Sequence, residues 1–475
     1  MLSARLPITA SKKKLYKFRP KDKEQKIETH HTKEKKKTVS VNSLSVERHV
    51  RQTLADKISG TLVGLWLLLP EHLRLGTWDL LTAWTGTANP NALDPRLALQ
   101  MVHESALCLN GLRQKRTLRQ KGFETLNGLP FVATDHSIHD LLDQHTIREA
   151  ESLQLALGQI RQCRDHYPGK FVLIDPHRIK TWTKRQLQPK KANISSTACK
   201  MLQTFFATDG ESGQPYGFGI GSPSLKVSQA TPPLVDRIAA ILPEEALLIA
   251  DTEHFTFELL NHLTRHEKFS ILLPVPQRKK ILGQISSMDF TPMWAGYAVA
   301  EGNYKPSDSH EPCRLIVQRT GETEDTYGYK AFVTTSQMPA ADLMTWVFPE
   351  RWNIEEFFNM EAALGWNRAS TLNLNIRFGK LSMALIAQAA IYELRKKLPD
   401  HISNWNVASM AQKLFSGIDG DLRVRDDTII VTFYNAPESK TLKKHYVNLP
   451  QKLEAEGIDP RVPWLYNFKV DFRFR

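Results

Sequence analysis

Two short apolar runs that each end in an aspartate stand out in the central part of the chain. Residues 171–174 (FVLI) are followed directly by Asp175, and residues 246–250 (ALLIA) are followed directly by Asp251. Apolar runs of this length that are bounded by polar residues are typical of buried strands. We therefore expect both carboxylates at strand ends.

The pattern around these runs predicts the rest of a sheet. Residues 209–213 (DGESG) separate two further strand-like runs and have the composition of a hairpin loop. Apolar positions spaced by three and four indicate helices in the same region. The expected strands are residues 171–175, 200–208, 214–220, 246–251 and 269–275, and the expected helices are residues 232–242 and 255–265. This order predicts an α/β fold with a ribonuclease-H-like mixed sheet flanked by helices.

A third carboxylate lies farther along the chain, where Glu355 stands in a segment whose apolar spacing suits a helix, residues 351–358 (RWNIEEFF). Two strand-end carboxylates and one helical carboxylate can converge on one point. Such hard oxygen ligands suit Mg²⁺, with Mn²⁺ as a substitute, better than zinc. On a basic chain this predicts phosphodiester chemistry with two metal ions. Glu356 is the alternative third ligand, but it takes the neighbouring face of the helix.

The charge of the chain favours a polyanionic partner. The 475 residues carry a net charge of +13, and the isoelectric point is about 9.4. Much of this charge lies in residues 11–37, which hold eleven Lys and one Arg against four acidic residues. We expect residues 1–45 to form a disordered basic arm. The arm could bind DNA phosphates, or it could be a solvated tail.

Cysteine usage and hydropathy bear on the type of protein and its compartment. The four cysteines, Cys108, Cys163, Cys199 and Cys313, are scattered and form no CxxC pair, which argues against a zinc site or a disulfide framework. The most apolar stretches are shorter than the roughly 20 residues that a membrane span needs. We expect a cytoplasmic, nucleoid-associated protein of bacterial type that has no membrane partner.

The remaining segments suggest a domain organisation. The pattern of residues 46–166 is mostly helical, which suits a DNA-binding domain or, alternatively, a helical packing domain. Short strand-like runs with turn residues predict a β-rich insertion that is separate from the sheet. The expected domains are residues 1–45 (basic arm), 46–166 (helical domain), 167–275 (first part of the catalytic core), 276–339 (β-rich insertion), 340–400 (second part of the core) and 401–475 (dimerisation or DNA contact).

The segment around Glu355 carries a family resemblance. Arg351 precedes Glu355 by four residues, in an apolar frame, and the predicted β-rich insertion comes before this segment. The arrangement resembles the DDE transposases of bacterial insertion sequences, in particular insertion sequence family 4 and its relatives, over roughly residues 171–398. Phe348 and Ala362 stand where that family has a tyrosine and a lysine that contact DNA phosphate.

The resemblance implies a function and roles for particular residues. Asp175, Asp251 and Glu355 would be the catalytic residues and metal ligands of a DNA transposase that cleaves transposon ends and transfers strands to target DNA. Its partners would be double-stranded DNA, namely terminal inverted repeats and target DNA, and a second copy of the chain in a homodimer. Trp294, in the insertion, would stack on a flipped base. The alternatives are a metal-dependent nuclease without joining activity and a non-catalytic DNA-binding protein derived from a transposase.

Cations near the predicted site are candidates for contacts with the DNA backbone. Arg351 lies one helical turn before Glu355 and would hold a phosphate. A basic cluster also follows Asp175, and its position favours a DNA-backbone role over that of a solvated loop. Its members are Lys180, Lys184, Arg185, Lys190 and Lys191.

Overall fold

The computed structural model describes most of the chain beyond residue 42. The described residues are 43–87, 89, 92–109, 120–181, 183–184, 189–190, 197–221, 226–305, 312–367 and 371–475. Contacts divide the chain into two units, Met1–Asn42 and Ser43–Arg475. The predicted basic arm lies outside the described residues, except for its last three, which begin helix α2 (Ser43–Ala55).

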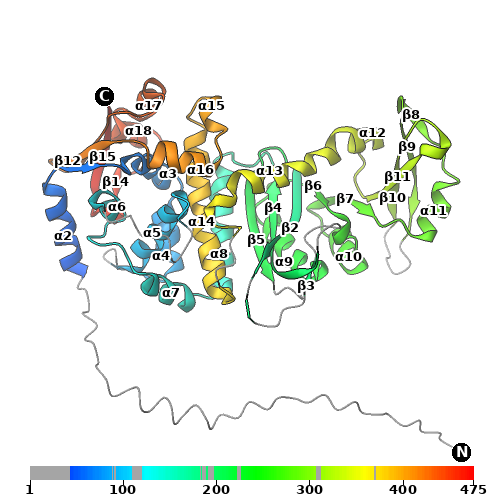
Figure 1. Cartoon of the computed structure of the whole chain (residues 1–475), viewed down its shortest axis with the longest axis horizontal. Coiled ribbons are helices and arrows are strands. Elements are labelled where there is room, and N and C mark those ends of the chain that lie inside the picture. The colour runs from blue at the N-terminus through cyan, green and yellow to red at the C-terminus, as the bar shows by residue number, and fades with distance from the viewer. Residues whose placement is uncertain are drawn as a thin grey trace, which may run out of the picture. The chain divides into compact units, whose positions relative to one another are not determined.

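A mixed sheet forms the middle of the second unit (Figure 1). Strands β2, β4 and β5 form an antiparallel meander, and β6 and β7 lie parallel to β2 on its other side. The bounds are β2 (Phe171–Lys180), β3 (Pro189–Lys190), β4 (Cys199–Asp209), β5 (Pro215–Gly221), β6 (Ala246–Ala250) and β7 (Phe269–Val275). Helices α9 (Val227–Ala239) and α10 (Phe257–Thr264) connect β5 to β6 and β6 to β7. This is the predicted ribonuclease-H-like α/β arrangement, so the expected fold class is confirmed.

Alternation of side chains along these strands creates two separate cores. Val172, Ile174 and Leu248 pack with α9 and α10 on one face of the sheet. Leu173 and Ile249 pack on the other face, against the helical turns that lead into α13. Because successive side chains of a strand point to opposite faces, residues at odd positions of β2 and β6 face α13.

The segment between β7 and α13 is rich in strands but is not separate from the sheet. Strand β11 pairs antiparallel with β7, with Ala331 opposite Val275, and β10, β9 and β8 follow in turn. Their bounds are β8 (Thr291–Trp294), β9 (Tyr297–Tyr304), β10 (Cys313–Thr320) and β11 (Gly328–Thr334), preceded by helix α11 (Lys279–Ile285). The predicted separation was wrong, because β7 offers an open edge that β11 extends.

After β11 the chain runs through consecutive helical turns towards Glu355. These turns are α12 (Ala340–Asp342), the π-helical turn η4 (Leu343–Val347), the 3-10 turn η5 (Phe348–Arg351) and α13 (Trp352–Glu361). Leu343, Val347 and Ile354 are fully buried in the core on this face of the sheet. Their burial holds η5 against β6 and α13 against β2.

Residues 46–166 are mostly helical, as expected, but they share one core with distant parts of the chain. The core joins these helices to α14 and to a second sheet with the strand order β1-β12-β13-β15-β14 (Figure 1). Almost every side chain of α14 is buried, so this helix needs partners on several faces. The helices are α3 (Leu69–Arg74), α4 (Thr77–Trp84), α5 (Asp94–Ala106), α6 (Lys121–Leu126), α7 (Asp135–Gln144), α8 (Ile147–Cys163), α14 (Leu374–Arg395), α15 (Asp400–Ser403), α16 (Val407–Met410), α17 (Ser439–Tyr446) and α18 (Leu449–Ala455). The strands are β1 (Ile58–Gly60), β12 (Gly420–Arg425), β13 (Thr428–Phe433), β14 (Arg461–Val462) and β15 (Phe468–Phe474).

Charged groups are also buried between these helices. The Glu71 carboxylate on α3 is fully buried. It accepts hydrogen bonds from Arg74 Nη1 at 3.2 Å, Lys397 Nζ at 2.7 Å and the Tyr446 hydroxyl. These contacts tie α3 to the end of α14 and to α17. None of the helices in the described part of the chain combines the length and the apolar character that a membrane span requires.

Candidate active site

Asp175 and Asp251 lie on neighbouring strands at one edge of the sheet. Strands β2 and β6 are parallel, and Ile174 is paired with Ala250, so the next residue of each strand is the aspartate. Both aspartates occupy odd positions, which places them on the face covered by α13.

Strand β2 is longer than its apolar run predicts. It continues to Lys180, because β4 still pairs with it beyond Asp175, for example Asp175 with Phe206. Only the pairing with β6 stops at Ile174. Asp175 is therefore at the end of the parallel pairing but in the middle of its own strand.

Arg351 joins Asp175 to Glu355. Its Nη1 lies 3.5 Å from Asp175 Oδ1, and its Nη2 donates a hydrogen bond to Glu355 Oε1 at 3.2 Å. The side chain of Asp251 accepts a hydrogen bond from the backbone N–H of Glu253 at 3.4 Å and caps the 3-10 turn that follows β6. The structure thus brings Asp175 and Glu355 each into contact with Arg351 and places Asp251 beside Asp175.

Electrostatics links the three carboxylates. Burial is the largest cause that raises the pKa of Asp175 to about 7; Arg351 opposes this shift, and Asp251 and Glu355 add to it. A carboxyl group that is buried beside two other acids is easier to ionise when cations lie close to it.

The donor set suits a hard divalent cation in its chemistry. Three carboxylates supply the oxygen ligands that Mg²⁺ and Mn²⁺ prefer. In their present positions, however, the described residues include no group of three or more His, Cys, Asp or Glu that could hold a metal ion. The Arg351 guanidinium lies between Asp175 and Glu355. The residue types therefore fit the metal, and Arg351 contacts two of the three carboxylates that would hold it.

The alternative ligand, Glu356, lines a different surface. It borders a pocket of about 410 Å³ together with Met360 of the same helix and residues 211–214 of the hairpin between β4 and β5. Glu355 and Arg351 do not line this pocket. The neighbouring carboxylate is therefore directed away from Asp175, as the helical spacing predicts.

The two histidines near the aspartates are neutral packing residues. His177 stacks on Phe358 with ring centroids 4.5 Å apart. Burial lowers the pKa of His177 and of His254 to about 4.

The predicted basic cluster is described only in part. Lys180 and Lys184 are exposed. Lys180 is five residues beyond Asp175 on β2, which corresponds to roughly 16 Å along a strand. Lys190 ends strand β3, and Arg185 and Lys191 lie outside the described residues.

Trp294 lies at the turn between β8 and β9. Its ring stacks on Tyr297 with centroids 4.2 Å apart and an interplanar angle of 5°. The residue is 55% exposed, so one face of this aromatic pair is open to solvent. Such a flat, exposed ring can stack on a nucleic-acid base.

A lysine that the sequence does not single out lies at the same edge of the sheet. Lys330 is the third residue of β11, and its Nζ is 4.7 Å from the ring centroid of Phe348. Burial and the charge of Arg351 lower the pKa of Lys330, and Asp251 opposes this shift. No local motif marks this residue, because only the pairing of β11 with β7 places it near Arg351.

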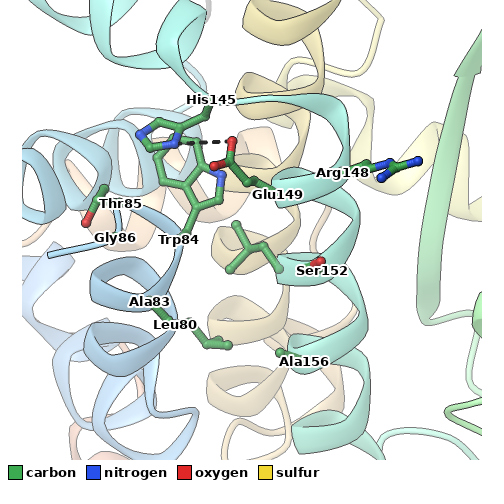
Figure 2. Close-up of a pocket in the computed structure, with 11 residues that line it drawn as sticks. Leu80, Ala83, Trp84, Thr85, Gly86, His145, Arg148, Glu149, Ser152 and Ala156 are labelled. Atoms are coloured by element: carbon green, nitrogen blue, oxygen red, sulfur yellow. Dashed lines mark ion pairs between the residues drawn. The ribbon is translucent and has the colours of Figure 1, made fainter.

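A further pocket, of about 440 Å³, lies between α4 and α8 (Figure 2). Trp84 packs on His145 with ring centroids 4.1 Å apart, and His145 Nδ1 lies 3.7 Å from a carboxylate oxygen of Glu149. None of the predicted site residues lines this pocket.

Comparison with known proteins adds a family match. Residues 166–389 match the family model described as Transposase DDE domain. A comparison with curated proteins finds no match. Among solved structures, the chain is similar to the piggyBac transposase in a synaptic complex with hairpin DNA, determined by cryo-EM, with 10% sequence identity and a TM-score of 0.42. That comparison covers 76% of this chain and 82% of the other. The segment that contains Asp175, Asp251 and Glu355 is therefore similar to a transposase DDE domain.

Proposed function

We propose that this chain is a DDE-type DNA transposase, of the kind found in insertion sequence family 4, which cleaves transposon ends and transfers the strands to target DNA. The observation that carries the proposal is the arrangement of the three carboxylates. Asp175 and Asp251 lie side by side on the face of the sheet that α13 covers, and Arg351 connects Asp175 to Glu355. The family match over residues 166–389 supports the same function.

Asp175, Asp251 and Glu355 would hold divalent metal ions, Mg²⁺ or Mn²⁺. When bound, such ions activate the attacking oxygen and stabilise the leaving oxygen of an in-line displacement at phosphorus. The residues of the chain contribute charge and position. Arg351 offsets the negative charge of two carboxylates and can turn towards a DNA phosphate, because its side chain is only partly buried, with 22% exposed. Water as the nucleophile gives strand cleavage, and a 3′ hydroxyl gives strand transfer.

DNA binding is supported by charge and by aromatic exposure. The net charge of +13 favours binding to a polyanion. Trp294 would stack on a base, which is worth about 1–3 kcal/mol. The exposed Lys180 and Lys184 would contact the backbone with Arg185, Lys190 and Lys191. Since one chain has one carboxylate set and an element has two ends, we propose a homodimer on paired ends in a bacterial cytoplasm.

The experiment uses the purified full chain and duplexes copied from the DNA that flanks its coding sequence on both sides. Incubation with Mg²⁺ or Mn²⁺ and a supercoiled plasmid should give cleavage at one defined position and joining of the labelled end to the plasmid. A shuffled duplex of the same composition is the control and should give neither product. Cleavage without joining would favour the nuclease alternative. Binding without cleavage would favour the non-catalytic alternative.

A further inference from the structure

Lys330 lies at the edge of the sheet that carries the aspartates. Strand β11 runs antiparallel to β7, and Ala331 is opposite Val275, the last residue of β7. Lys330 therefore lies beside the residue that follows β7. Asp251 is the residue that follows β6, so both lie at the same edge of the sheet. Two strand spacings separate β11 from β6, which corresponds to about 10 Å.

Lys330 also lies on the same face of the sheet as the aspartates. Its neighbour at the next even position, Phe332, is buried in the core beneath η4 and α13, whereas Ala331 faces the opposite core. Lys330 Nζ lies 5.3 Å from the Phe332 ring centroid and 4.7 Å from the Phe348 ring centroid. The two rings, which meet edge to face at 4.6 Å, form an apolar shelf under the ammonium group.

The charge of Lys330 is not neutralised by an ion pair, although Asp251 acts on it at longer range. Within the described part of the chain, no ion pair or hydrogen bond involves its ammonium group, and the residue is exposed to solvent. Its cationic neighbour Arg351, one helical turn after Phe348, already contacts two carboxylates. Cation–π contact with the rings fixes the position of the ammonium group without neutralising it.

We propose that Lys330 binds a DNA phosphate next to the one that is cleaved, and that the Phe332 and Phe348 rings hold its ammonium group in place for this contact. This inference rests on the proposed function. The distance of about two strand spacings from the Asp251 strand favours a flanking phosphate over the scissile one. An exposed ammonium group that forms no ion pair within the described part of the chain, on the face of the sheet that carries the carboxylates, suits a phosphodiester ligand.

The test compares Lys330→Gln, Lys330→Arg and the control Lys170→Gln in the full-length chain. Lys170 is an exposed lysine directly before β2, at the opposite edge of the same sheet. Binding of a fluorescein-labelled duplex from the flanking DNA is measured by anisotropy in a salt titration with EDTA, so that the DNA is not cut. Circular dichroism and the unfolding midpoint establish that each variant is folded.

Lys330→Gln should weaken binding roughly tenfold or more and should reduce the slope of log K against log salt by about 0.9. Lys330→Arg should restore the slope, and Lys170→Gln should leave the slope and affinity unchanged. An unchanged slope in Lys330→Gln would overturn the inference, even if the unmodified chain binds and cleaves the duplex. If the unmodified chain binds the flanking duplex no better than a shuffled one, the proposed function fails and this inference falls with it.

Discussion

At the scale of single residues, Arg351 links two parts of the candidate site, because its guanidinium contacts one carboxylate from a strand and one from a helix. One positive charge in contact with Asp175 and Glu355, beside Asp251, leaves an excess of negative charge when all three acids are ionised. The raised pKa of Asp175, about 7, reflects its burial beside two other acids. A divalent cation would reduce this excess.

We therefore predict that Mn²⁺ stabilises the folded chain in the absence of DNA. At a concentration ten to a hundred times its dissociation constant, the ion should raise the free energy of unfolding by about 1–3 kcal/mol. Thermal unfolding with and without Mn²⁺ measures this effect. Asp251→Asn should lose the stabilisation and Glu356→Gln should keep it. Equal stabilisation of the unmodified chain and Asp251→Asn would place the ion elsewhere.

At the scale of elements, the sequence predicts local structure better than pairing between distant strands. The runs that end at Asp175 and Asp251 correctly indicate strands, because burial on both faces gives a continuous apolar pattern. The extension of β2 to Lys180 and the addition of β11 to β7 depend on partners that are far away in the sequence. For the same reason Lys330 could not be found from any motif.

The roles of the site residues remain predictions. Their positions, like the strand pairings, could be predicted only where local geometry decides them. The four-residue spacing of Arg351 and Glu355 correctly predicts that they share a helical face, since local geometry decides it. The contact between Arg351 and Asp175 could be expected only from the resemblance to a family. The sequence also does not reveal that β2 continues beyond Asp175, which places Lys180 five residues farther along the same strand.

The buried contacts of Glu71 give a prediction about packing between helices. Glu71→Ala should lower the free energy of unfolding by about 3 kcal/mol, because it removes a fully buried carboxylate that contacts Arg74 and Lys397. Arg74 keeps its ion pair with Glu456, and Lys397 keeps its ion pair with Glu393, so neither cation is left unpaired. Urea unfolding measures the change. The matched control is Glu47→Ala, which removes a partly exposed ion pair with Arg51 on α2 and should cost less than about 1 kcal/mol. Equal losses in the two variants would show that the buried pair is not special.

At the scale of the whole molecule, the pKa values of four buried histidines and of the half-buried His177 are lowered, chiefly by burial. The pKa falls to about 4 for His103, His166, His177 and His254, and lies well below its ordinary value for His72. The unfolded chain therefore binds protons between pH 6.5 and about 4 that the folded chain does not bind. Asp175 acts in the opposite direction, since its raised pKa makes the folded chain bind a proton first.

Because the five histidines favour unfolding at low pH and Asp175 alone favours folding, acidification should destabilise the fold. We predict that the urea midpoint is highest above pH 6.5 and decreases as the pH falls from 6.5 to about 4, with no further loss from these histidines below that. His103→Gln, which keeps a donor for Asn127, should reduce the dependence. A midpoint that does not change between pH 7 and pH 5 would contradict the neutral state of these histidines.

The central claim is that Asp175, Asp251 and Glu355 act together in cutting DNA. The most direct measurement is the rate of metal-dependent cleavage of the flanking duplex by Asp175→Asn, Asp251→Asn, Glu355→Gln and the control Glu356→Gln, with DNA binding measured in parallel. We predict that each of the first three loses roughly a hundredfold or more in rate while still binding DNA, and that Glu356→Gln cleaves like the unmodified chain. Normal cleavage by any of the first three variants, or an equal loss in Glu356→Gln, would contradict the account.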